Sequence, residues 1–148
     1  MKKGLINKDV IFPVIVIMDG EYSVDKNISG YTICKKSAIP DLAKRNEFVI
    51  DAATNYYKRI DISFLRYINS FWGFSLKYAG VGVCYTERKL ELVKNLNIDE
   101  LKGVYLTYLK EHSEQLENVG LDTAKMIREM TDLTQKEEVF RRFVNTII

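Results

Sequence analysis

The side chains that most often carry catalysis are few in this chain. It holds one histidine, His112, and two cysteines, Cys34 and Cys84, among 148 residues. A Cys–His or Ser–His system needs its nucleophile beside its base, and the spacing of these three residues does not predict that they meet. The apolar residues around His112 recur at helical spacing. We therefore expect His112 to pack at the edge of the core, without a catalytic role.

The two cysteines have no CxxC spacing, which excludes a zinc ribbon or a thioredoxin-like motif. Both lie in strand-like stretches beside aromatic residues, so we expect two buried free thiols in a reducing compartment. A single disulfide between Cys34 and Cys84 is the alternative. The chain also lacks GxGxxG, Walker and HExxH motifs, and we expect no cofactor, no bound metal and no enzymatic activity.

Four carboxylates stand at the ends of expected strands: Asp19, Glu21, Asp51 and Asp61. Paired carboxylates can perform acid–base work or hold a metal ion. However, Asp19 precedes a glycine in a hairpin signal and Asp51 opens another turn, and turns favour aspartate without any ligand. We therefore assign no catalytic or metal-binding residue.

A stretch that mixes aromatic and basic residues is the remaining candidate site. Its members are Tyr56, Tyr57, Lys58, Arg59, Arg66, Phe71, Trp72 and Lys77. On a sheet face they could stack on single-stranded nucleic acid, and the same residue types are preferred at protein interfaces. The alternation over residues 56–62 places Tyr57 and Arg59 on the more polar side, which we expect to face water. We predict Tyr57, Arg59, Arg66 and Trp72 as partner-binding residues.

Hydrophobic periodicity shows which elements must position these residues. Strands are expected over residues 10–18, 21–24, 31–35, 47–51, 56–62, 74–78 and 79–85. The first should begin at or just after Pro13, which has no ladder donor, and Asp19-Gly20 is a strong hairpin signal. Residues 39–46 suggest a turn or a single helical turn, and residues 64–72 fit either a helix or a bulged strand.

After Glu87 the apolar period changes from two to about 3.6 residues, which predicts helices. Asn97 is a good N-cap for a long helix that Gly120 would close. Asp122 can cap a short helix, and residues 134–137 form a capping box for a last helix. That last helix has an apolar stripe: Val139, Phe140, Phe143, Val144 and Ile147.

These elements predict one α+β domain over residues 1–148, sheet-rich in 1–90 and helical in 97–148. We expect an antiparallel or mixed sheet of four to six strands with helices packed on one face. The net charge of +2 is too balanced to indicate a nucleic-acid partner or an acidic nucleic-acid mimic. The apolar run after Lys2-Lys3 is too short to span a membrane, and Asp19-Gly20-Glu21 stands where a cleavage site would be. We expect a cytoplasmic protein with no membrane partner.

Three segments carry a resemblance to a known group: residues 13–24 (PVIVIMDGEYSV), 47–60 (EFVIDAATNYYKRI) and 71–76 (FWGFSL). They resemble small bacterial immunity proteins of polymorphic or contact-dependent toxin systems, whose sheet is likewise followed by helices. The chain departs from the usual glycine in the turn at residues 52–55, and it is not acidic. The resemblance implies a non-enzymatic module that binds and neutralises a cognate toxin. The alternatives are a structural or regulatory homo-oligomer and a nucleic-acid-binding protein that uses the aromatic-basic face.

Overall fold

The Asp-Gly turn predicted from the sequence joins the first two strands. In the computed structural model, β1 (Val14–Met18) and β2 (Glu21–Asp25) pair antiparallel, with Met18 opposite Glu21. Asp19 and Gly20 have φ angles of 49° and 84°, and a two-residue hairpin turn with two positive φ angles favours this residue pair. Both the hairpin and the start of the first strand directly after Pro13 are confirmed.

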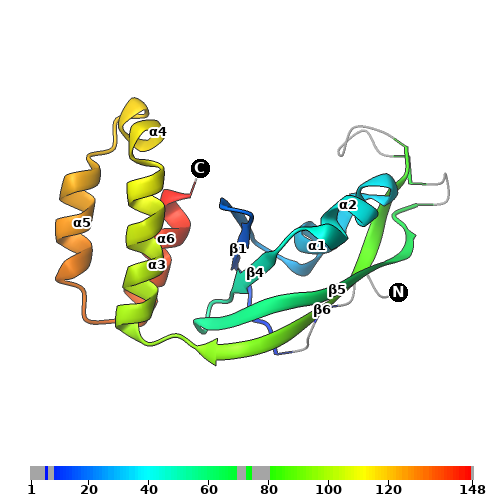
Figure 1. Cartoon of the computed structure of the whole chain (residues 1–148), viewed down its shortest axis with the longest axis horizontal. Helices are drawn as coiled ribbons and strands as arrows, with labels where there is room; N and C mark the ends of the chain where they lie inside the picture. Colours follow the sequence, from blue (N-terminus) through cyan, green and yellow to red (C-terminus); the bar gives the residue numbers. More distant parts are fainter. Residues whose placement is uncertain (1–5, 7–8, 70–72, 75–80, 148) are drawn as a thin grey trace. The chain divides into compact units, whose positions relative to one another are not determined.

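Six strands form one curled antiparallel sheet in the order β2-β1-β4-β5-β6-β3 (Figure 1). The other four strands are β3 (Ile33–Lys35), β4 (Glu47–Ile50), β5 (Asn55–Tyr67) and β6 (Val83–Asn95). β4 lies between β1 and β5, with Val49 opposite both Val16 and Tyr57. The α+β class and the predicted number of strands are confirmed.

The structure describes residues 6, 9–69, 73–74 and 81–147, and the chain divides into two compact units. We call Met1–Lys94 the sheet unit and Asn95–Ile148 the helical unit, and each is described by itself. The division falls between the sheet-rich and helical segments predicted from the sequence, while the single domain stays a prediction. The predicted strand over residues 74–78 lies outside the described residues except for residue 74. Of the run predicted over residues 79–85, residues 79–80 lie outside the described residues and residues 83–85 begin β6.

Short helical segments occur between β2 and β4 in the sheet unit: α1 (Ile28–Thr32), the 3-10 turn η1 (Lys36–Ala38) and α2 (Ile39–Lys44). The prediction of a strand over residues 31–35 is therefore wrong for its first half. The Asn27 side chain accepts a hydrogen bond from the Gly30 amide at 2.9 Å, which caps a helical turn here. Over residues 39–46 the predicted helical turn is a six-residue helix.

The long strands β5 and β6 correct two further expectations. The ambiguous segment after residue 64 continues as strand to Tyr67. β6 extends to Asn95, so the predicted change of period after Glu87 comes eight residues too early. Burial still alternates there, with Arg88 and Leu90 buried and Lys89 and Glu91 exposed, which is the pattern of a strand with one covered face.

Four helices form the helical unit: α3 (Ile98–Glu111), α4 (Ser113–Asn118), α5 (Thr123–Thr131) and α6 (Lys136–Thr146). The predicted N-caps Asn97 and Asp122 are confirmed, since each side chain accepts a backbone amide. The single long helix expected after Asn97 instead breaks at His112, whose φ and ψ are −113° and 16°. The predicted capping box over residues 134–137 is wrong, because the N-cap is Gln135 and its side chain makes no capping bond.

Aromatic packing holds the core of the helical unit together. The rings of Tyr105 and Phe143 stack with centroids 4.8 Å apart, and Tyr108 approaches Phe143 at 5.6 Å. Leu101 and Leu109 are fully buried with them.

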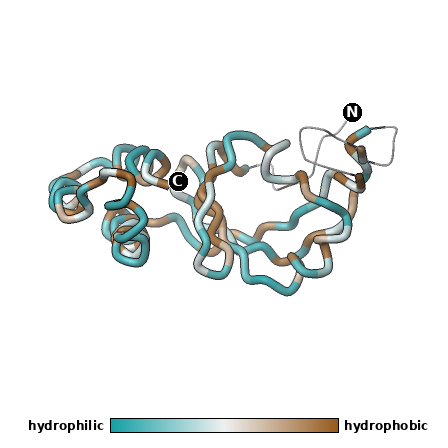
Figure 2. The backbone as a smooth tube through the Cα atoms, turned by 90° about the horizontal axis from the view of Figure 1, so that it is seen from above, coloured by the Kyte–Doolittle hydropathy of each residue, from teal (hydrophilic) through white to brown (hydrophobic). Residues whose placement is uncertain are grey.

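Figure 2 shows apolar and polar residues alternating along both units. No described helix is long and apolar enough to span a membrane.

Candidate functional site

A buried carboxylate is the centre of the polar chemistry in the sheet unit. Glu47, the first residue of β4, has a side chain that is 0% exposed. The Tyr31 hydroxyl donates to its Oε2 at 2.5 Å. Arg59 Nε lies 3.1 Å from the same oxygen, and Arg88 Nη1 lies 3.0 Å from Oε1. Both carboxylate oxygens are therefore occupied by residues of α1, β5 and β6, which we call the Glu47 network.

Arg88 connects this network, through Thr86 of its own strand, to the last residue of α1. Its Nε donates to Thr86 Oγ1 at 3.2 Å, and the Thr86 hydroxyl donates to the Thr32 carbonyl at 2.7 Å. The guanidinium also lies 4.4 Å above the Tyr31 ring. Burial by itself would lower the pKa of Arg88, but the Glu47 carboxylate and Tyr31 outweigh it and raise that pKa. Arg88 is thus held as a permanent cation.

Tyr31 acts in this network as a hydrogen-bond donor. Burial, followed by the charge of Glu47, raises the pKa of Tyr31 far above its ordinary value. A phenol in that state keeps its proton at any physiological pH. We therefore assign the Glu47 network a structural role, because the Glu47 carboxylate already has three partners and the Tyr31 phenol does not exchange a proton.

Arg59 links the network to the end of α2. Its Nη2 donates to the carbonyls of Leu42 at 2.6 Å and Arg45 at 3.0 Å, which satisfies acceptors left over at a helix C-terminus. Its Nε–H does not point at Glu47, so that contact is an ion pair without a hydrogen bond. Arg59 also lines a polar pocket of about 160 Å³ together with Lys44 and Asp61.

The structure overturns the predicted orientation of β5. Tyr57 and Arg59 were expected to face water, but they are only 3% and 8% exposed, whereas Lys58 and Ile60 are exposed. Tyr57 belongs to the apolar core. The polar residue Arg59 turns inward because the buried Glu47 and the α2 carbonyls supply its partners there.

The other two predicted partner-binding residues have different outcomes. Arg66 is half-buried, and its guanidinium lies 4.5 Å over the Tyr85 ring, a cation–π contact within one sheet. Trp72 lies outside the described residues. The structure therefore does not bring the four predicted residues together into one exposed patch.

Sequence reasoning missed Tyr31, Glu47 and Arg88 as members of a shared cluster. The available signal was limited to Glu47, a charged residue that opens an apolar strand, because Arg88 lies between the charged residues Glu87 and Lys89. A charge inside an apolar strand needs a buried partner. That signal indicates a network but cannot identify its members, since Glu47 and Arg88 are 41 residues apart.

The predicted turn roles of Asp19 and Asp51 are confirmed, whereas Asp61, expected at a strand end, lies within β5. Asp51 accepts hydrogen bonds from the backbone amides of Ala53 at 3.0 Å and Asn55 at 2.9 Å, as expected for an aspartate in a turn. Asp19 is bonded to Arg45 Nε at 2.9 Å, and this bond is the main cause of its lowered pKa. Among the described residues, no group of three or more His, Cys, Asp or Glu is placed to hold a metal ion.

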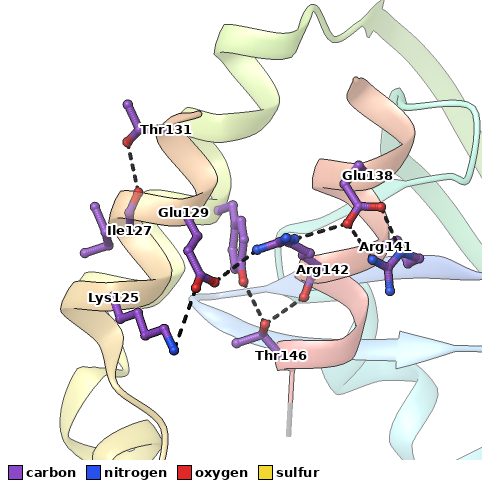
Figure 3. A network of polar contacts seen from close by, with 9 residues as sticks. Lys125, Ile127, Glu129, Thr131, Glu138, Arg141, Arg142 and Thr146 are labelled. Atoms are coloured by element: carbon purple, nitrogen blue, oxygen red, sulfur yellow. Dashed lines mark hydrogen bonds and ion pairs between the residues drawn. The ribbon is translucent and has the colours of Figure 1, made fainter. Parts of the chain in front are cut away.

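A second pocket, of about 280 Å³, lies in the helical unit. Tyr105, Glu129, Arg141 and Arg142 are among its lining residues, and Figure 3 shows the polar contacts around it. Arg142 Nη1 lies 3.2 Å from Glu129 Oε2, and its Nε lies 3.2 Å from Glu138 Oε1. The charged lining residues are thus already in ion pairs, of which the Arg142–Glu129 pair joins α6 to α5.

Hydrogen bonds also join three residues that line this pocket, Tyr105, Arg142 and Thr146. The Thr146 hydroxyl donates to the Arg142 carbonyl at 2.7 Å and lies 2.7 Å from the Tyr105 hydroxyl (Figure 3). Glu138 contacts both Arg141 and Arg142, and their hydrogen bonds lower its pKa. Ion pairs this exposed contribute about 0–1 kcal/mol each. The pocket is therefore a gap between paired side chains, and we assign no ligand to it.

His112 occupies the junction between α3 and α4. Its ring stacks on Tyr108 with centroids 4.5 Å apart, and its Nδ1 lies 3.1 Å from the Tyr108 carbonyl oxygen. It is half-buried. This is the packed, core-edge position expected from the sequence.

We predict that His112→Ala leaves any binding activity of the folded protein intact. The side chain contacts its own helix, so its loss should cost about 1 kcal/mol of stability and nothing in partner affinity. Affinity measured beside the melting temperature checks this. Complete loss of activity with an unchanged melting temperature would show a functional role for the imidazole.

No protein-family model matches this chain, and neither a curated protein nor a solved structure matches it significantly.

Proposed function

We propose that this protein is a non-enzymatic protein-binding module, an immunity or inhibitor protein that neutralises a cognate toxin. The observation that carries the proposal is the exposure of large apolar side chains on two adjacent strands. Ile60 in β5 is 56% exposed, and Val93 in β6 is 53% exposed. We call these two residues the ribbon patch. Large apolar side chains that stay exposed on adjacent strands indicate an interaction site.

Charge supports a protein partner of acidic character. The sheet unit contains 15 lysines and arginines against 10 aspartates and glutamates, a net charge of +5. Exposed Lys58 and Lys89 lie in the same two strands as the ribbon patch. Electrostatic complementarity raises association rates and selects partners. We therefore infer a partner surface that combines an apolar centre with acidic side chains around it.

Two observations weigh against the alternative functions. A nucleic-acid site on the aromatic-basic face loses two of its members, because Tyr57 and Arg59 are buried and cannot stack on bases. A homo-oligomer through the last helix would need the apolar stripe of α6 to be free. Phe140 and Phe143 are instead 6% and 0% exposed within one chain.

The test is protection from a toxin by co-expression. The products of genes adjacent to this one are expressed in bacteria with the parent protein, with Ile60→Asp or with Val93→Asp. We expect the parent to prevent growth arrest and both variants to fail, since loss of an apolar interface centre typically weakens binding roughly thirtyfold. Val119→Asp is the matched control, because Val119 is 61% exposed in the helical unit.

The results distinguish the proposed immunity function from the proposal that the ribbon patch is its interface. If no adjacent product is toxic or none binds the purified protein, the immunity function is wrong. If a toxin is neutralised by Ile60→Asp and Val93→Asp as well as by the parent, the function stands but the ribbon patch is not the interface. Thermal melting of each variant confirms that the fold is retained.

A further inference from the structure

The two cysteines of the chain, 50 positions apart, lie directly opposite each other in the sheet. β3 and β6 pair antiparallel, and the register places Cys34 against Cys84. Opposed residues of an antiparallel pair have Cα atoms about 4.5–5.5 Å apart. A disulfide spans Cα distances of about 4.4–6.8 Å. The backbone therefore needs no rearrangement to accommodate a bond between these residues.

The side chains of the pair are already in contact as free thiols. Neither cysteine is in a disulfide, and the two thiols hydrogen-bond to one another. Cys84 is 0% exposed, whereas Cys34 is half-buried. A reagent in solution can therefore reach Cys34, and Cys84 is placed to attack whatever forms on it.

We propose that Cys34 and Cys84 are a redox modification site, at which thiol–disulfide exchange with a small disulfide such as oxidised glutathione forms a reversible intramolecular bond. The Cys34 thiolate attacks one glutathione sulfur, the S–S bond breaks, and the first glutathione leaves as a thiolate. Cys84 then attacks the Cys34 sulfur of the mixed disulfide and releases the second glutathione. The two protons lost by the protein thiols end on the two glutathiones, so oxidation of the cysteines balances reduction of the reagent.

The surroundings of the pair decide how fast this exchange proceeds. Burial raises the pKa of Cys84 to about 11 and also raises the pKa of Cys34, while the charge of Arg88 acts on Cys34 in the opposite direction. Only a small fraction of either thiol is ionised at neutral pH, and the thiolate is the attacking species. We therefore expect exchange to take minutes to hours.

The disulfide would link the short edge strand β3 covalently to β6. β3 has three residues and is the last strand in the sheet order. A bond from Cys34 to Cys84 encloses α2, β4 and β5, including Glu47 and Arg59 of the buried network. Closing so long a loop reduces the conformational freedom of the unfolded chain. Oxidation should raise the melting temperature of the sheet unit by about 10 °C.

The experiment treats the full-length reduced protein with oxidised glutathione and follows its intact mass. We expect a loss of about 2 Da, reversal by a reducing agent, and a non-reduced digest in which the Cys34 and Cys84 peptides are linked. Cys84→Ser should stop at one glutathione adduct on Cys34. Cys34→Ser should stay unmodified for as long as it is folded.

The same reaction in denaturant is the control, because it shows that both thiols react with oxidised glutathione when they are exposed. The proposal is overturned if the folded parent stays reduced while the denatured chain reacts. It is equally overturned if the folded parent accumulates two glutathione adducts or a disulfide-linked dimer. The parent measurement stands alone, so these outcomes hold even if a serine variant folds poorly.

Discussion

Glu47→Gln should lower the free energy of unfolding of the sheet unit by about 3–5 kcal/mol. The substitution keeps the size of the side chain but removes a carboxylate that lies within ion-pair distance of both Arg59 and Arg88. Arg59 and Arg88 are 8% and 6% exposed, and a buried charge that loses its partner is strongly destabilising. Urea unfolding, followed by amide NMR signals of the sheet unit, measures the change.

Glu21→Gln is the matched control for this prediction. Glu21 is also a strand carboxylate paired with an arginine, at 3.5 Å from Arg45, but its side chain is 79% exposed. Solvent-exposed pairs contribute little, so we expect a change within about 0.5 kcal/mol. A Glu47→Gln protein as stable as the control would show that the Glu47 network does not depend on its charge.

A double substitution tests the cause of the effect. Replacing Arg88 by Met in the Glu47→Gln background removes one of the orphaned cations while keeping much of its apolar stem. The double variant should therefore lose less stability than the sum of the two single variants, because residues of one ion-pair network couple by about 0.5–3 kcal/mol. Strict additivity would contradict a shared electrostatic origin.

Phe143→Ala should destabilise the helical unit by about 3–5 kcal/mol. Phe143 is 0% exposed and stacks on Tyr105 at 4.8 Å, so its removal deletes a ring and leaves a cavity that small movements cannot fill. Helical ellipticity at increasing urea concentration measures the loss. Val119→Ala, at a valine that is 61% exposed, should change stability by no more than about 0.5 kcal/mol.

Deletion of residues 134–148 is the harsher form of the same test. It removes α6 and exposes the apolar faces of Tyr105 and Tyr108, which contact Phe143. We expect a poorly soluble protein whose helical unit no longer melts cooperatively. A truncated chain that melts like the full-length protein would show that α6 is an appendage to the helical unit.

Much of the fold could be predicted because its signals are local. The Asp19-Gly20 hairpin and the caps Asn97 and Asp122 depend on the φ preferences and hydrogen-bonding groups of a few adjacent residues. The errors arose where a local signal competed with another one. The extension of β6 past Glu87 was missed because Leu90 and Leu92 have the spacing of a strand, while Leu90 and Val93 have the spacing of a helix.

What the sequence by itself determined about this protein is its α+β class, the succession of a sheet-rich part by helices, and local signals such as the Asp19-Gly20 hairpin and the caps Asn97 and Asp122. Only the tertiary structure decided which face of each strand is covered. Period-two alternation shows that Tyr57 and Arg59 share a side, but not which side meets the core. Arg59 is buried because Glu47, 12 positions away, supplies a counter-ion and the Leu42 carbonyl, 17 positions away, supplies an acceptor. Likewise, Cys34 and Cys84 oppose each other through strand register, which is set by long-range pairing and leaves no mark at either position in the sequence.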